Sequence, residues 1–235
     1  MGTFAQDTAN EYQLTREEQD AYSIESLSRA NAAIESGAFA DEVVPVTFKT
    51  RKGDVTVDTD EQPGKGRPDK IPTLRAAFAK DGTITAATSS SISDGAAAVV
   101  LTRESVAKEN GQSPVAKIIA LAAHAREPKD FTVAPVGAIE KVLANAGWSV
   151  DDVDLWEVNE AFACVAMFAM RDIGIDHAKI NVNGGATALG HPIGASGTRI
   201  IVTLINALKS QGKKRGIASL CIGGGEATAV AVELA

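Results

Sequence analysis

The stretch from 181 to 197, NVNGGATALGHPIGASG, constrains the fold more than any other part of the chain. Five glycines and Pro192 surround a single histidine, His191. Glycine adopts backbone conformations closed to other residues and lets another backbone or a ligand come close. Apolar residues then recur at helical spacing, at 200, 201, 204, 207 and 208. The pattern predicts a strand up to about Val182, a tight loop that holds His191, and a buried helix.

The glycine spacing alone does not identify a ligand. Gly190, Gly194 and Gly197 resemble a phosphate-binding loop, but no Lys-Ser or Lys-Thr pair follows, and the order is not GxGxxG. From composition alone, a lone histidine in such a loop is more often structural than catalytic. His191 is a site candidate only if other residues join it.

Composition excludes several classes of protein. The 235 residues suffice for one large domain or two small ones, and the net charge of −7 offers no basic patch for nucleic acid. No apolar run of about 18 residues predicts a membrane span. The N-terminus lacks the basic and apolar regions of a signal peptide. We therefore expect no nucleic-acid or membrane partner and a cytoplasmic location.

Cysteine and histidine usage argues against a disulfide framework and a metal site. Cys164 and Cys221 lie far apart without a CxxC motif, and the three histidines lack metal-ligand spacing. We expect a reducing compartment and no bound metal.

The sequence of the first hundred residues predicts helices, a hairpin and a long surface loop. Residues 1–36 are expected to be helical, with a capping box at Thr15 and Glu18 and an end at Gly37. Strands are expected at 43–48 and 55–57, joined by a turn at 52–54. The polar stretch 59–72 predicts a surface loop, functional or merely solvated. A hydroxyl-rich loop and a packed strand at 96–101 should follow.

From about residue 117 the pattern alternates between strands and helices. Strands are expected at 118–122, 153–158, 180–182, 216–220 and 228–234, and helices at 136–146, 160–171 and 198–211. The last two strands form a hairpin through three glycines. This alternation predicts an α/β fold.

Two further residues join His191 at predicted strand ends. Asn159 follows one strand, where it can orient a water or simply cap the next helix. Cys221 ends another, before three glycines whose N–H groups can stabilise an oxyanion; the alternative is a small buried hydrophobe. Taken one at a time, the structural role is favoured for each residue: a loop histidine, a helix cap at Asn159 and a buried apolar side chain at Cys221. Together, a thiol, an imidazole and an amide at one sheet edge predict an acyl-transfer or carbanion site.

These residues lie in three motifs that resemble the thiolase family: NEAFA at 159–163, GGATALGHPIGASG at 184–197 and CIGGG at 221–225. The likeness extends to the start MGTFAQDTANEYQLTREEQDAY and to the LRAAF and SDGAAA segments. It points to acetyl-CoA acetyltransferases and 3-ketoacyl-CoA thiolases. The resemblance implies an α/β thiolase-like fold with a complete C-terminal half, part of the loop domain and no N-terminal half. It divides the chain into 1–92 (partial CoA-binding loop domain), 93–113 (end of the N-terminal half) and 114–235 (C-terminal domain).

The resemblance also implies catalytic roles. His191 activates the nucleophilic cysteine, and Asn159, through a water, holds the thioester oxygen together with His191. Cys221 moves the proton at the α-carbon of the substrate. The N–H of Gly223 contributes to a second oxyanion hole.

The same resemblance implies a coenzyme A site, with the thioester as substrate and no separate cofactor. Ser90 contacts the pantetheine arm. Met1, Phe78, Ala161 and Phe162 line its tunnel. Arg67 and Lys70 lie near the nucleotide end.

Some features depart from the family pattern. The family's nucleophilic cysteine lies in its N-terminal half, and neither cysteine here matches it by motif. Glu226 stands where the family usually carries an uncharged residue. The chain is therefore expected to be a subunit that needs an N-terminal thiolase partner, a truncated piece, or a non-catalytic CoA-binding scaffold.

Retention of His191, Asn159 and Cys221 favours an enzyme part. We expect it to be inactive alone, and to be a homo- or hetero-oligomer or poorly soluble because apolar surface is uncovered. Chain-length preference and the favoured direction, condensation or thiolysis, stay open.

Overall fold

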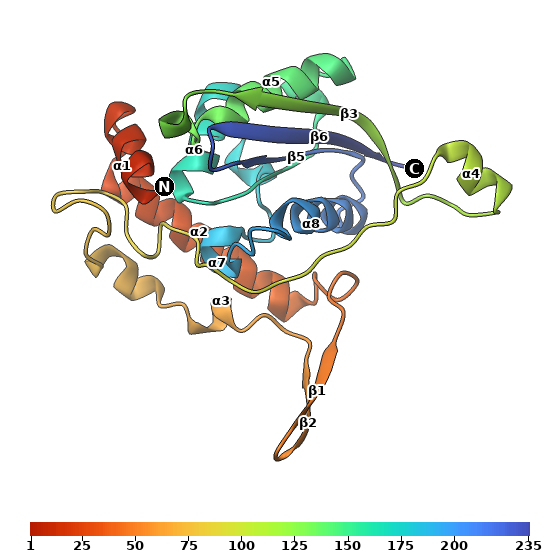
Figure 1. Ribbon diagram of the computed structural model, residues 1–235, viewed down its shortest axis with the longest axis horizontal. Coiled ribbons are helices and arrows are strands. Elements are labelled where there is room, and N and C mark those ends of the chain that lie inside the picture. The colour runs from red at the N-terminus through yellow and green to blue at the C-terminus, as the bar shows by residue number, and fades with distance from the viewer.

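A four-stranded mixed sheet forms the centre of the molecule (Figure 1). The computed structural model describes all 235 residues. The strand order is β3-β6-β5-β4, with β4 parallel to β5 and the other neighbours antiparallel. The strands are β3 (Ala116–Ala125), β4 (Leu155–Val158), β5 (Arg215–Cys221) and β6 (Glu226–Leu234).

Helices cover both faces of this sheet, as the α/β prediction required. Helices α5 (Ala134–Ala146) and α6 (Ala163–Ile173) pack on one face, and α8 (Ser196–Ser210) packs on the other. Side chains alternate along β4: Trp156 joins the α5/α6 core, whereas Leu155 joins the α8 core. No helix in the chain combines the length and apolar character needed to cross a membrane.

The N-terminal helices form as their capping signals predict. In α2 (Arg16–Ser36), Thr15 and Glu18 make both bonds of a capping box. Gly37 ends the helix in the left-handed conformation, with φ of 74°. The remaining elements are α1 (Gly2–Glu11), hairpin strands β1 (Val46–Thr50) and β2 (Gly53–Val57), α3 (Gln62–Lys65), α4 (Glu104–Glu109), α7 (Ala186–Leu189) and 3-10 turns at Pro68–Thr73, Pro128–Asp130, Val150–Asp152 and His177–Lys179.

The predicted surface loop at 59–72 contains short helical elements. It holds α3 and a 3-10 turn, and most of its residues are exposed. Pro63 and Ile71 are buried and anchor it to the body of the molecule.

Two strand predictions are wrong. The run 96–101 forms no strand; it crosses the outside of the molecule toward α4, and Val100 is 96% exposed (Figure 1). A strand requires a neighbour to satisfy its backbone groups, and this run lies beside no strand of the chain. Residues 180–182 make only one bridge, between Ile180 and Trp156, because Asn181 turns the chain with φ of 47°.

Candidate active site

The ends of β4 and β5 bring Asn159 and Cys221 to one edge of the sheet. Val158 pairs with Ser219 in the parallel register, and the N–H of Asn159 donates to the carbonyl of Ser219 at 3.0 Å. Cys221 lies two residues farther along β5. Both side chains therefore lie at the carboxyl edge, where open α/β sheets hold ligands.

Asn159 does not cap helix α6. That helix begins at Ala163, three residues after the predicted start at residue 160, and its N-cap position is Phe162. The side chain of Asn159 is buried, and its Oδ1 accepts no hydrogen bond from the chain. The capping alternative for Asn159 is therefore wrong, and Oδ1 is free to bind another group.

His191 reaches the same edge through the serine-rich segment rather than through a strand. Its N–H donates to the carbonyl of Ser91 at 2.9 Å, and it bridges to Ile92. Gly190 has φ of +84°, and a Cβ there would overlap Ser93 Oγ. This close approach requires the glycine. The ring Nε2 of His191 lies 3.5 Å from Asn159 Nδ2.

Hydrogen bonding defines which ring nitrogen of His191 is basic. Nδ1 lies 2.6 Å from Ser196 Oγ, and that hydroxyl donates to the carbonyl of Pro192 at 3.0 Å. Because the Ser196 hydrogen is used there, its oxygen accepts from Nδ1–H. This leaves the Nε2 lone pair toward Asn159. Burial, with a smaller effect of Arg199, lowers the pKa of His191, so the ring is neutral at pH 7 and Nε2 can accept a proton.

Cys221 is a protonated thiol at neutral pH. Burial raises the pKa of Cys221 to about 12. Cys164 also has a raised pKa through burial, but it lies inside the α6 core with no exposed surface. Of the two thiols, only Cys221 ends a strand beside a glycine loop.

The glycine loop after Cys221 presents free backbone donors. Gly225 accepts from the N–H of Arg126, and with φ of +100° its missing Cβ would lie 2.6 Å from the carbonyl of Arg126. This contact fixes the loop. The N–H groups of Gly223 and Gly224 donate to no group of the chain, so they can stabilise a developing negative charge.

A buried carboxylate that the motif analysis did not assign ties this edge together. Glu160 is fully buried and accepts five hydrogen bonds of 2.7–3.1 Å. The donors are Tyr22 Oη, Ser26 Oγ, Asn181 Nδ2 and the N–H and Oγ1 of Thr187. Glu160, which directly follows Asn159, thus links helix α2 to the segment from Asn181 to Thr187 that precedes His191. The sequence signal for this role was the presence of an acidic residue inside the otherwise apolar end of the motif NEAFA.

The residues expected to line a pantetheine tunnel cluster in part. The rings of Phe78 and Phe162 meet edge to face, with centroids 5.9 Å apart. Gly2 packs on the Phe78 ring, and Met1 Sδ lies 3.7 Å from the Cβ position of Gly223. This group therefore connects the N-terminus of the chain with the glycine loop.

Ser90 lies at the edge of this cluster. Its Oγ donates to the carbonyl of Ala161 at 2.9 Å, and its N–H donates to the same oxygen. In this structure Ser90 therefore holds the middle of the NEAFA segment.

Arg67 and Lys70 lie apart from the aromatic group. With Lys65 they line a separate cavity of about 430 Å³, whose wall also contains Ser89, Ser91 and Thr187. Together with Ser23, which also lines it, the cavity has three cations and four hydroxyl groups, which is the chemistry of an anion site. Ser91 connects it with the His191 loop.

Two family models match the chain. Residues 112–234 match the model described as "Thiolase, C-terminal domain", and residues 1–105 match "Thiolase, N-terminal domain". The chain belongs to the thiolase family. Its α/β fold is the thiolase fold, as the motifs predicted.

Similar thiolases extend beyond this chain. An acetyl-CoA acetyltransferase of Yarrowia lipolytica is 50% identical over 99% of the chain and 58% of its own length. The crystal structure of the Bacillus anthracis acetyl-CoA acetyltransferase matches with a TM-score of 0.97 and 43% identity, covering all of this chain and 60% of that one. An Ascaris suum thiolase in complex with coenzyme A matches with a TM-score of 0.90 and 40% identity, over 100% and 60%. The chain spans about 60% of the length of these thiolases.

Proposed function

We propose that the chain supplies the C-terminal part of a thiolase active site of the acetyl-CoA acetyltransferase type. Such a site condenses two acetyl-CoA molecules to acetoacetyl-CoA and free coenzyme A, and catalyses the reverse thiolysis. The observation that carries the proposal is the placement of Asn159, His191 and Cys221 at one sheet edge. The names of the similar proteins support this reaction class.

In the first step, His191 Nε2 takes the proton of a nucleophilic cysteine. The resulting thiolate attacks the carbonyl carbon of acetyl-CoA, the bond to the coenzyme A sulfur breaks, and that sulfur leaves with the proton. In this proposal the nucleophile comes from an N-terminal thiolase segment, on the same polypeptide or on a partner chain. The lowered pKa of His191 suits a base at neutral pH.

The second step forms the carbon–carbon bond. The Cys221 thiol first gives its proton to the neutral Nε2 of His191, and the resulting thiolate removes an α-proton from a second acetyl-CoA and so becomes a thiol again. The carbanion attacks the acyl group on the nucleophilic cysteine, which leaves as thiolate and takes the proton from His191. Asn159, through a water, and the Nε2–H of the protonated His191 hold the oxygen of the enolate, and the Gly223 N–H holds the oxygen of the acyl group. In thiolysis, the protonated Cys221 thiol returns the proton to carbon. Its raised pKa suits the acid role.

In this proposal coenzyme A uses two surfaces of the chain, the aromatic group and the cavity with the cations. The apolar pantetheine would lie along Met1, Phe78, Ala161 and Phe162, near the oxygen atoms of Ser90. The phosphates would lie toward the cavity that Arg67 and Lys70 line, because cations and hydroxyl groups recognise phosphate.

The exposed run 96–101 supports the need for a further thiolase segment. Its apolar sequence AAAVVL has the character of a buried strand, yet Val100 and Leu101 are 96% and 72% exposed. A sheet in an N-terminal half would give this run the neighbours that it lacks. The chain would then act within a larger assembly.

The proposal is tested by capturing the tagged chain from its native host and assaying acetoacetyl-CoA thiolysis in the eluate. We expect a thiolase N-terminal segment to co-elute, as a chain or as the rest of the polypeptide, and the eluate to turn over. His191→Ala should abolish turnover, whereas His124→Ala, on β3 outside the site, should retain it. Turnover by the pure chain would overturn the proposal. A chain that elutes alone, inactive, but with coenzyme A affinity would make it a binding module.

A further inference from the structure

The side chain of Gln62, in the short helix α3, is bonded at both ends of its amide group. Its Nε2 donates to Ser93 Oγ at 2.8 Å, and its Oε1 accepts from Ser91 Oγ at 2.6 Å. Gln62 and Ser91 both line the cavity that holds the three cations. Gln62 therefore fastens one wall of that cavity to the serine-rich segment.

The serine-rich segment in turn holds the loop of His191. The carbonyl of Ser91 accepts the N–H of His191 at 2.9 Å, and the two segments bridge at Ile92. At Gly190 a Cβ would lie 2.7 Å from Gln62 Nε2 and would also overlap Ser93 Oγ. Gln62 thus packs directly against the residue before His191, and one hydrogen bond separates it from the residue whose carbonyl holds the His191 backbone.

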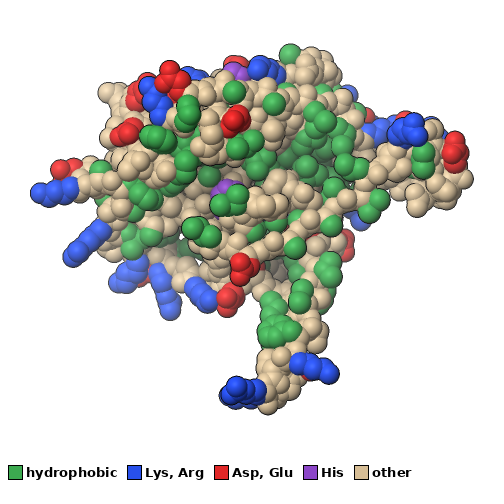
Figure 2. All heavy atoms as spheres, in the orientation of Figure 1, with side chains coloured by type: hydrophobic (Ala, Val, Ile, Leu, Met, Phe, Trp, Pro, Cys, Tyr) green, Lys and Arg blue, Asp and Glu red, His purple; other side chains and the backbone are tan.

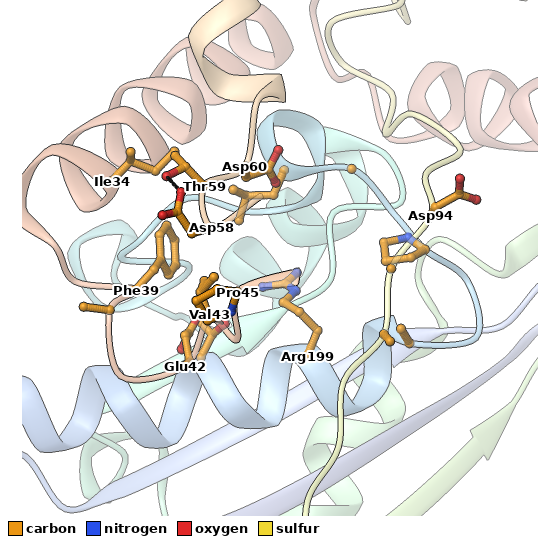
Figure 3. A pocket seen from close by; sticks show the side chains of 18 of the residues that line it. Ile34, Phe39, Glu42, Val43, Pro45, Asp58, Thr59, Asp60, Asp94 and Arg199 are labelled. Carbon is orange, nitrogen blue, oxygen red and sulfur yellow. Dashed lines mark hydrogen bonds between the residues drawn. The ribbon is translucent and has the colours of Figure 1, made fainter. Parts of the chain in front are cut away.

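The contacts continue on the other side of this junction. The N–H of Gln62 donates to Asp60 Oδ1 at 2.9 Å, which fixes the start of α3. Figure 3 shows Asp60 and Asp94 in the wall of the neighbouring cavity, on the segments that lead to α3 and away from Ser93. A Cβ at Gly95 would lie 2.7 Å from the ring of Pro192, the residue after His191. The start of α3, the serine-rich segment and the His191 loop are therefore packed as one unit.

The cations of the cavity lie directly beyond Gln62 in sequence. Lys65 ends α3, and Arg67 and Lys70 belong to the turn that follows it. Figure 2 shows basic side chains gathered along this part of the surface. Like charges that share one cavity repel each other, and a bound anion replaces that repulsion by attraction. An anion in this cavity would therefore hold α3, and with it Gln62, in place.

We propose that Gln62 is a positioning residue that couples anion binding in this cavity to the placement of His191. The proposal rests on the proposed function, which puts the coenzyme A phosphates in the cavity. With the anion bound, Gln62 holds Ser91 and Ser93 against Gly190, and His191 Nε2 keeps its place beside Asn159. A part of the substrate that does not react then helps to orient the base, which is how remote binding energy serves catalysis.

The coupling is tested by the histidine ring signals in the NMR spectrum of the full chain, with inorganic pyrophosphate as the anion. The chain has three histidines, and the spectrum of His191→Ala identifies the His191 signals. Saturating pyrophosphate, checked by calorimetry, should shift the His191 signals. The signals of His124 are the internal control and should not move, because its ring packs on Gly137 beside the opposite edge strand β3.

Variants of Gln62 separate coupling from binding. At saturating pyrophosphate, Gln62→Ala should reduce the His191 shift at least roughly fivefold, the lower end of common couplings between sites. Gln62→Glu keeps the length of the side chain, and both serine hydroxyls can donate to its carboxylate, so the shift should return. Gln211→Ala, an exposed position at the far end of α8, is the matched control and should behave as the wild type.

A smaller change tests the same link if Gln62→Ala fails to fold, as checked by circular dichroism. Ser93→Ala removes one of the two hydrogen bonds of the Gln62 amide and should roughly halve the shift. An undiminished shift in either variant would overturn the proposal. So would a Gln62→Ala chain that no longer binds pyrophosphate, because Gln62 would then belong to the anion site itself.

The same experiment distinguishes this proposal from the proposed function. Pyrophosphate that binds the wild type without shifting His191 would overturn the coupling and leave the thiolase reaction standing. A wild type that binds no pyrophosphate would overturn the coupling together with the placement of the phosphates. A shift that depends on Gln62, in a chain that no N-terminal segment makes active, would support the coupling and count against the reaction alone.

Discussion

Apolar residues lie in opposite environments in two regions of the molecule. One region is the carboxyl edge of the central sheet, and the other is hairpin β1–β2, here called the arm. At the sheet edge, Glu160 is buried and accepts five hydrogen bonds, and apolar residues from both faces of β4 are covered. On the arm, Phe48 and its apolar neighbours face outward. The first region has its partners within this chain, whereas the apolar side chains of the arm are exposed. Stability should therefore depend far more on the first region than on the second.

The largest expected contrast is between two phenylalanines. Phe168 is fully buried in α6 and packs on Tyr12 with ring centroids 4.9 Å apart. Phe168→Ala should lower the free energy of unfolding by roughly 4 kcal/mol, because it leaves a cavity. Phe48→Ala should change it by less than about 0.5 kcal/mol. Urea denaturation of both variants measures the contrast, and equal losses would show that the arm is part of the folded core.

The buried carboxylate gives the next largest effect. Glu160→Ala strands the buried donors of Tyr22, Ser26 and Asn181 and should cost roughly 3 kcal/mol. The exposed Glu140→Gln is the control and should be neutral in the same denaturation experiment. A Glu160→Ala chain as stable as the control would mean that the network does not tie the site elements together.

Glu157 should make stability fall with rising pH. Burial raises the pKa of Glu157 to about 8 from its ordinary 4.5. Between these values the folded chain holds a proton that the unfolded chain releases, so the free energy of unfolding falls as pH rises through this range. Glu157→Gln should remove this fall and gain on the order of 2 kcal/mol at pH 8.5, with little gain near pH 4.5. Thermal melts across this range measure it; a gain independent of pH would contradict the raised pKa.

The smallest effect on stability is expected at the exposed run. Leu101→Ser should change the free energy of unfolding by less than about 0.5 kcal/mol, because the side chain is 72% exposed. The same substitution should weaken capture of an N-terminal thiolase segment in a pull-down. A large loss of stability without loss of capture would place Leu101 in this chain's own core.

Much of the fold was predictable because periodicity and end signals agree in the C-terminal half. Helices α5 and α8 and strands β3 to β6 form where their patterns predict, within a few residues. The run 96–101 shows the limit, since its pattern describes a buried strand but cannot show whether the neighbouring strands are in the chain. The turn at Asn181 shows another limit, because a local φ of 47° ends pairing within an apolar stretch.

The site was predictable from its motifs, but its supports were not. The pattern predicts Asn159 and Cys221 at strand ends, and both lie at the carboxyl edge of the sheet. The hydrogen bond from His191 Nδ1 to Ser196 Oγ depends on the first turn of α8, five residues later, which periodicity does not reveal. Glu160 was visible as an acid in an apolar motif, but two of its five donors come from helix α2, more than 130 residues away in sequence.

The most direct test of the central claim is acetoacetyl-CoA thiolysis by the purified chain, before and after addition of the N-terminal segment of the Yarrowia lipolytica relative. The account expects no turnover by the chain alone, turnover by the mixture, and loss of that turnover in His191→Ala. Turnover by the chain alone would contradict it. A mixture that sediments as one complex and remains inactive would contradict it equally.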